Sequence, residues 1–171
     1  EESYGYMLGD YVRDKDAVTA SLLITEMAAW YAAQGMTLYD ALQALYRKYG
    51  WYGEKTHNLV MPGLDGLEKM AALMQSLRDV PPADIAGVAV TARTDYKDGT
   101  VTDCASGKVT ASELKGSNVL RYALADGTVI LVRPSGTEPK IKTYFTTLGK
   151  TLEEAQAQKD ALAAAIEPIL K

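Results

Sequence analysis

Residues 119–147 read VLRYALADGTVILVRPSGTEPKIKTYFTT, and this stretch decides the fold. Two apolar runs, Val119–Ala125 and Thr128–Val132, flank an Asp-Gly pair at residues 126–127. An Asp-Gly pair between such runs is the strongest short-range signal for a β-hairpin. A further apolar run, Ile141–Thr147, predicts another strand after an intervening loop. The stretch therefore predicts a mostly antiparallel sheet.

Helical and strand patterns lie on both sides of this stretch. Thr151 to Glu154 form a capping box that opens a last helix, and apolar residues from Leu67 to Leu77 share one helical face. Thr56–Met61 and Ile85–Thr94 predict strands, and residues 100–117 predict a loop with one short strand. The predicted fold class is α+β, with a small sheet packed against helices on one face.

The first third of the chain predicts a helical hairpin that precedes this sheet. Acidic residues at 14 and 16 precede an apolar helical stripe, and Gly35 ends it. Thr37 and Asp40 resemble a capping box for a second helix. Gly50 and Gly53 then mark a boundary. We expect two domains, residues 1–50, mainly helical, and residues 51–171.

The composition excludes several functional classes. The chain has 171 residues, is 47% hydrophobic and carries a net charge of -4, which argues against a protein that coats nucleic acid or anionic membrane. Its longest apolar run, Met27–Ala33, is far too short to span a membrane. One cysteine, Cys104, and one histidine, His57, leave no disulfide framework and no zinc-type cluster. We expect no nucleic-acid or membrane partner and no metal ligands in this chain.

The loop between two predicted strands, Arg133–Lys140, has the composition of an oxyanion site. Arg133 offers a planar fork of donors, and Ser135 and Thr137 add hydroxyl groups. Gly136 would let backbone N–H groups turn inward. A tight turn uses the same residue types, so a purely structural role stays open. Lys140 and Lys142 follow on a strand, where alternation predicts solvent exposure.

The first five residues, Glu1-Glu2-Ser3-Tyr4-Gly5, could hydrogen-bond vicinal sugar hydroxyls, or they could be a solvated terminus. Together with the segment 12–16 and the Arg133–Lys140 loop, in this order, they closely resemble the α-D-phosphohexomutases. The resemblance is to the bacterial phosphoglucomutase/phosphomannomutase branch, which is also similar to phosphopentomutases.

The resemblance implies a four-domain enzyme that interconverts hexose 1-phosphate and 6-phosphate through a phosphoserine and a bisphosphate intermediate. Glu1 and Ser3 would bind sugar hydroxyls, and Lys15 matches a lysine near the cleft. A phosphate group would be held by the four residues Arg133, Ser135, Gly136 and Thr137. The implied cofactors are Mg²⁺, bound elsewhere in the full-length enzyme, and glucose 1,6-bisphosphate as intermediate or activator. The implied partners are a sugar phosphate and the remaining domains of the same polypeptide, in the cytoplasm.

No D-G-D-x-D-R aspartate loop and no nucleophilic serine segment occur in the sequence. We therefore expect a C-terminal fragment, the end of the third domain plus the fourth, that has no catalytic residue of its own and is inactive alone. A phosphomannomutase or phosphopentomutase, a non-catalytic phosphate-binding module and a structural interaction domain are the alternatives.

Overall fold

The structure, a computed structural model, describes residues 5–136 and 138–170. The fold class is α+β, as predicted, with four helices and an eight-stranded sheet among these residues. The chain divides into two compact units, Glu1–Tyr49 and Gly50–Lys171.

The first unit is helical. Helix α1 (Ala17–Ala32) is capped by the Asp16 side chain, which accepts hydrogen bonds from the Val18 and Thr19 amides. Helix α2 (Leu38–Tyr49) begins with a reciprocal capping box, in which the Asp40 amide donates to Thr37 Oγ1 (3.1 Å) and the Thr37 amide to Asp40 Oδ2 (2.9 Å). Both helix starts are therefore confirmed. No helix in the described part of the chain is long and apolar enough to cross a membrane.

The second unit is built on an antiparallel sheet. In chain order its strands are β1 (Trp51–Val60), β2 (Asp84–Ile85), β3 (Val88–Asp95), β4 (Thr100–Asp103), β5 (Val109–Ala111), β6 (Leu120–Leu124), β7 (Val129–Pro134) and β8 (Lys140–Gly149). The sheet runs in the order β1-β8-β7-β6-β3-β4-β5, and β2 pairs with β3. The predicted Asp-Gly hairpin is confirmed as β6–β7, in which Ala123 faces Val129.

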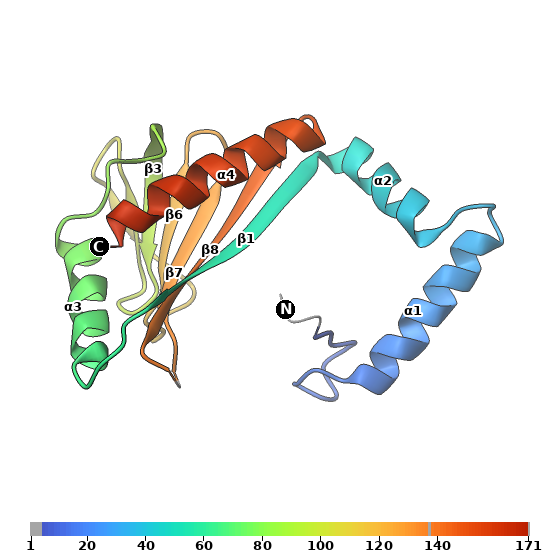
Figure 1. Ribbon diagram of the computed structural model, residues 1–171, viewed down its shortest axis with the longest axis horizontal. Helices are drawn as coiled ribbons and strands as arrows, with labels where there is room; N and C mark the ends of the chain where they lie inside the picture. Colours follow the sequence, from blue (N-terminus) through green and yellow to red (C-terminus); the bar gives the residue numbers. More distant parts are fainter. Residues whose placement is uncertain (1–4, 137, 171) are drawn as a thin grey trace. The chain divides into compact units, whose positions relative to one another are not determined.

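Two helices pack on one face of this sheet, α3 (Gly66–Asp79) and α4 (Leu152–Ile169). Helix α4 packs on β1 and β8, and Figure 1 shows it lying along the sheet. Burial alternates along β8, from fully buried Ile141, Thr143 and Phe145 to the half-buried residues between them. This alternation is typical of a sheet with one covered face and one face toward solvent.

The core lies between the sheet and the two helices. Its buried residues are Met70, Met74, Leu77, Ile85, Val90, Leu120, Tyr122, Leu124, Ile130, Val132, Ile141, Phe145, Leu162, Ile166 and Leu170. Helix α4 approaches the sheet at glycines: a Cβ on Gly149 would lie 2.5 Å from the Ala155 amide nitrogen, and one on Gly53 would lie 2.8 Å from the Ala155 carbonyl oxygen. Glycine at these positions lets the helix lie close to the strands.

Three element boundaries differ from the prediction. Residues 100–117 hold two short strands, β4 and β5, because Thr100–Thr102 pair with Val109–Ala111 as a hairpin. The predicted strand 85–94 is split by a turn at Ala86 and Gly87, which both have positive φ, 54° and 76°. Strand β1 begins at Trp51 instead of Thr56, so Gly53 lies inside a strand and not at a boundary. Pairing with the ten residues of β8 extends β1 past its apolar part.

Candidate phosphate-binding loop

The candidate oxyanion loop joins β7 to β8, two strands whose pairing holds both of its ends. Arg133 lies opposite Lys142, and Pro134 lies opposite Ile141. The Ser135 amide donates to the Lys140 carbonyl (2.8 Å), which closes the loop. The Met61 amide donates to the Pro139 carbonyl (2.8 Å), which ties the loop to the chain after β1. The loop is therefore fixed on both sides.

Arg133 lies on the face of the sheet opposite α3 and α4. In the pairing of β7 with β8, Leu131 lies opposite Tyr144 and Arg133 lies opposite Lys142. One guanidinium nitrogen, Nη2, donates to Tyr144 Oη at 3.3 Å, and the guanidinium carbon lies 5.7 Å from the centre of the Tyr144 ring. These two contacts orient the guanidinium while the Arg133 side chain stays exposed. An exposed, oriented guanidinium suits the binding of an oxyanion.

The loop offers further donors beside Arg133. Among residues 5–136 and 138–170, no hydrogen-bond partner holds the Gly136 amide or the Ser135 hydroxyl. A Cβ on Gly136 would meet nothing within 4 Å, and its φ lies outside the left-handed region. The fold therefore does not require glycine here, and a glycine leaves open space beside the amide.

The two lysines after the loop are less exposed than predicted. The Lys140 ammonium pairs with Glu138, and its side chain is 22% exposed. The hydrogen bond from Lys140, together with its charge, holds the pKa of the Glu138 carboxyl below its usual range. Lys142 is half-buried, with its ammonium 6.0 Å from the centre of the Tyr144 ring. Both lysines lie on the side of β8 away from its buried residues, as the alternation predicts, but each is half-buried because it lies against a neighbouring group.

The remaining predicted site residues fall in the first unit or outside the described part of the chain. Glu1, Ser3 and Thr137 lie outside the described residues. Lys15 lies against Gly5, where an added Cβ would be 2.8 Å from Lys15 Cγ, and its ammonium pairs with Asp14 at 3.0 Å. The Asp16 amide donates to the Tyr6 carbonyl (2.9 Å), which brings the two ends of this segment together. Lys15 thus lies next to the last residue of the predicted sugar-binding stretch.

Tyr144 contacts Arg133 and is a site residue that the loop motif alone does not predict. It lies eleven positions after Arg133 in the chain. The signal was present in the alternation of β8, because Tyr144 follows Lys142 on the same face, but the pairing of β7 with β8 was needed to bring it to Arg133.

No group of three or more His, Cys, Asp or Glu side chains in residues 5–136 and 138–170 is arranged to hold a metal ion.

Comparison with known proteins identifies the family. Residues 58–165 match the family model for the phosphoglucomutase/phosphomannomutase C-terminal domain, and residues 1–49 match the model for phosphoglucomutase/phosphomannomutase alpha/beta/alpha domain III. The chain belongs to the phosphoglucomutase/phosphomannomutase family. The resemblance stated from the sequence is thus confirmed.

Curated relatives within this family are named phosphoglucomutase. A phosphoglucomutase from Staphylococcus haemolyticus (strain JCSC1435) is 40% identical over 146 residues, which are 85% of this chain and 26% of that protein. One from Staphylococcus aureus (strain MSSA476) is 35% identical over 164 residues, 95% of this chain and 29% of that protein. The chain spans about a quarter of the length of these relatives.

A solved structure has the same fold. The exocytosis-sensitive phosphoprotein pp63/parafusin, a phosphoglucomutase from Paramecium in its open form, matches with a TM-score of 0.57 and 18% identity. The match covers 99% of this chain and 28% of that structure.

Proposed function

We propose that the chain is the C-terminal part of a phosphoglucomutase-type enzyme that interconverts hexose 1-phosphate and hexose 6-phosphate. In this proposal the whole enzyme, located in the cytoplasm, works through a phosphoserine and a bisphosphate intermediate, such as glucose 1,6-bisphosphate. Membership of the family and the names of the relatives support it.

The role proposed for this chain is to bind the substrate. Arg133 grips the phosphate that is not being transferred, with the Ser135 and Thr137 hydroxyls and the Gly136 amide as further donors. The observation that carries this role is the guanidinium of Arg133, exposed and oriented by Tyr144 beside an open loop. Glu1, Ser3 and Lys15 would bind the sugar. A fixed anion site away from the reacting atoms holds the substrate in place while chemistry proceeds at its other end.

The nucleophile and Mg²⁺ belong, in this proposal, to other parts of the full-length protein. Mg²⁺ supplies electrostatic stabilisation of the transferring phosphoryl group. No candidate aspartate loop or serine segment occurs in the 171 residues, which supports the expectation that the chain alone is inactive.

The binding role is tested by titrating the full chain with glucose 1-phosphate and with inorganic phosphate while amide resonances are recorded. We expect saturable shifts at Ser135 and Gly136. Arg133→Gln should abolish them, while Arg93→Gln, on the other face of the sheet, should leave them unchanged. Absence of any shift at these amides at tens of millimolar ligand would contradict the role of the loop.

The catalytic context is tested in the full-length protein. Arg133→Ala should lower kcat/KM by about 100-fold, because a charge-assisted contact to phosphate is lost. Assays with mannose 1-phosphate and with a pentose 1-phosphate distinguish a phosphomannomutase or a phosphopentomutase from a phosphoglucomutase. An unchanged kcat/KM in the variant would overturn the proposal.

A further inference from the structure

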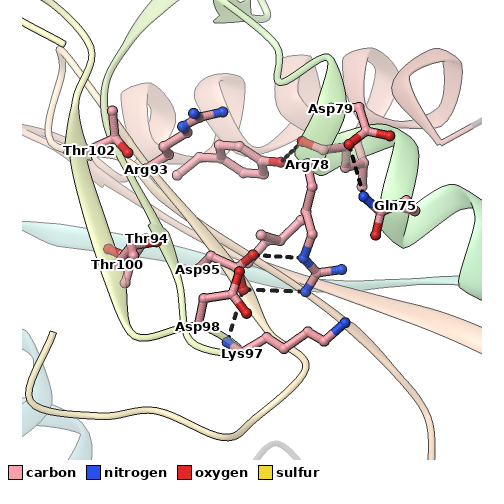
Figure 2. A pocket seen from close by; sticks show the side chains of 13 residues that line it. Gln75, Arg78, Asp79, Arg93, Thr94, Asp95, Lys97, Asp98, Thr100 and Thr102 are labelled. Atoms are coloured by element: carbon pink, nitrogen blue, oxygen red, sulfur yellow. Dashed lines mark hydrogen bonds and ion pairs between the residues drawn. The ribbon is translucent and has the colours of Figure 1, made fainter. Parts of the chain in front are cut away.

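A cavity of about 330 Å³ lies on the helix-covered face of the sheet, at the side away from β1. Its walls come from the end of α3, strands β3 and β4, the turn between them, and β6. Figure 2 shows that charged and hydroxyl groups predominate among the labelled side chains. A volume of this order is at the lower end of those that bind small ligands.

Part of the charge in this cavity is internally neutralised. Arg78 Nε donates to Asp95 Oδ2 at 2.7 Å, and its Nη2 donates to Asp95 Oδ1 at 3.3 Å and to Asn118 Oδ1 at 2.6 Å. Burial raises the pKa of the Asp95 carboxyl, but hydrogen bonds from the Arg78 side chain and the Lys97 amide, together with the charges of both residues, outweigh it and leave the pKa below its usual value. Arg78 and Asp95 therefore form an ion pair and largely neutralise each other's charge.

Arg93 is the second arginine that lines the cavity. It lies opposite Thr102 on β4 and opposite Tyr122 on β6, so the three side chains share one face. Among the described residues, no hydrogen bond or ion pair is made by its side chain. A half-buried guanidinium with unused donors, lining a cavity, is suited to an anion.

A second hollow continues the cavity past Arg93 toward Pro81 and Pro82. The two share Arg78, Asp79, Arg93 and Thr102 as walls. Arg93 thus stands where the two hollows meet, and its donors can be reached from both.

The other polar groups define the rest of the ligand. Asp79 lines both hollows and, among the described residues, accepts one side-chain hydrogen bond, from Gln75 Nε2 at 2.8 Å, so acceptor capacity remains on its carboxylate. Thr100 and Thr102 present hydroxyls on the opposite wall. Carboxylate and hydroxyl groups recognise hydroxyl hydrogens, and the guanidinium recognises an oxyanion.

We propose that this cavity is a second binding site, for a small organic oxyanion that carries hydroxyl groups. Arg93 binds the anionic end, and Asp79 and Thr102 bind the hydroxyls. The site lies on the opposite face of the sheet from Arg133, because Arg93 shares a face with buried Tyr122 whereas Arg133 lies on the face opposite α3 and α4. It does not rest on the proposed function.

The test uses the full chain and three probes followed by amide and Arg Nε–H resonances: gluconate, acetate, and sorbitol. Gluconate has both the charge and the hydroxyls, acetate has only the charge, and sorbitol has only the hydroxyls. We expect gluconate to shift the Arg93 and Thr102 resonances saturably in the millimolar range, with no coupled change at Gly136. Acetate and sorbitol should bind at least tenfold more weakly.

Two variants and one control locate the binding. Arg93→Gln should weaken gluconate binding at least tenfold, and Thr102→Val should weaken it several-fold while keeping the guanidinium. The control is Arg121→Gln, because Arg121 lies opposite Thr94 and Leu131, on the other face of the same sheet. It should leave gluconate binding unchanged.

The proposal is overturned if gluconate causes no saturable shift at Arg93 and Thr102, or if Arg121→Gln weakens binding as much as Arg93→Gln. Equal binding of acetate would overturn the role of the hydroxyls, and equal binding of sorbitol would overturn the role of Arg93. Unchanged resonances elsewhere in Arg93→Gln show that the variant is folded.

Discussion

The two units of this chain use apolar residues in opposite ways. In the described residues of the first unit, 5–49, only Ala41 is buried, and α1 exposes Val18 (80%) and Trp30 (61%). In the second unit, aromatic and aliphatic side chains fill one continuous core between the sheet and two helices. Apolar residues therefore form a core in the second unit and lie largely at the surface in the described part of the first.

The distribution of apolar residues indicates which unit stabilises the chain. Helix α1 carries a single charged residue, Glu26, and is apolar around its whole circumference. A helix of this kind is typical of a buried position. The family model that matches residues 1–49 describes an alpha/beta/alpha domain, in which helices cover a sheet. We infer that residues 50–170 carry the folding free energy of the chain.

The largest expected effect comes from comparing two substitutions, Phe145→Ala in the second unit and Trp30→Ala in the first. Phe145 is 1% exposed, so its loss should lower the free energy of unfolding by about 3–5 kcal/mol through lost burial and a cavity. Trp30→Ala should change it by less than about 0.5 kcal/mol. Chemical denaturation of each variant measures both values, and a Trp30→Ala cost as large as that of Phe145→Ala would refute the inference.

Gly149→Ala tests the close approach of α4 to the sheet. The added methyl group meets backbone atoms of Thr151 and Ala155, which cannot move aside without shifting the helix, and should cost about 1–3 kcal/mol. The control is Gly136→Ala, where the methyl group meets open space, and we expect a change below about 0.5 kcal/mol. Thermal unfolding of the pair gives the comparison; equal midpoints would show that the contact has no effect on stability.

Asp95→Asn compares the ion pairs of the two units. The Arg78 and Asp95 side chains are only 12% and 16% exposed, so the loss should cost about 1.5–3 kcal/mol at pH 7. The matched variant in the first unit is Asp14→Asn, whose ion pair with Lys15 joins side chains that are 50% and 76% exposed, and no measurable change is expected.

The same pair predicts a pH dependence. Because the pKa of Asp95 is lower in the folded than in the unfolded state, its stabilisation is complete above the unfolded value of about 3.9 and is lost as the pH falls through the folded value. Chemical denaturation is measured at roughly one-unit steps between about pH 6 and pH 2. Over this range the free energy of unfolding should fall less for Asp95→Asn than for the parent. An identical acid response would contradict this assignment.

The smallest expected effect is a gain. Ala86 has a φ of 54°, a conformation that costs an L-residue energy but not glycine, so Ala86→Gly should raise stability by about 0.5–1 kcal/mol. Ala89→Gly, three positions later inside β3, should lower it by about the same amount. A loss of stability in Ala86→Gly would show that the strain is absorbed elsewhere.

Much of the fold could be predicted because its signals are local. The Asp-Gly hairpin at residues 126–127 and the capping box at Thr37 each depend on residues within a few positions of one another. Helix α4 begins after Thr151, whose hydroxyl accepts from the Glu154 amide at 3.2 Å, as its capping box predicts. Such patterns act over a single turn, so one sequence suffices to find them.

The remaining features depend on pairing between distant segments. The small polar residues 100–111 form a hairpin, β4–β5, whose first strand pairs with β3. The local sequence pattern does not predict this pairing. The Arg133 loop could be located from its composition, but the contact of Arg133 with Tyr144 depends on the register of β7 with β8. The Arg93 cavity escaped prediction for the same reason, since its walls come from four elements.

The pairing of β1 with β8 constrains the order in which the second unit folds. It is the first strand of that unit, yet it pairs along its whole length with β8, which is the last. The chain must close a long loop before this pairing gives any free energy in return. During synthesis on a ribosome, residues 51–60 therefore cannot pair until β8 has emerged, which is after almost the entire unit has been made. The first and the last strand of the unit then join the sheet in the same step.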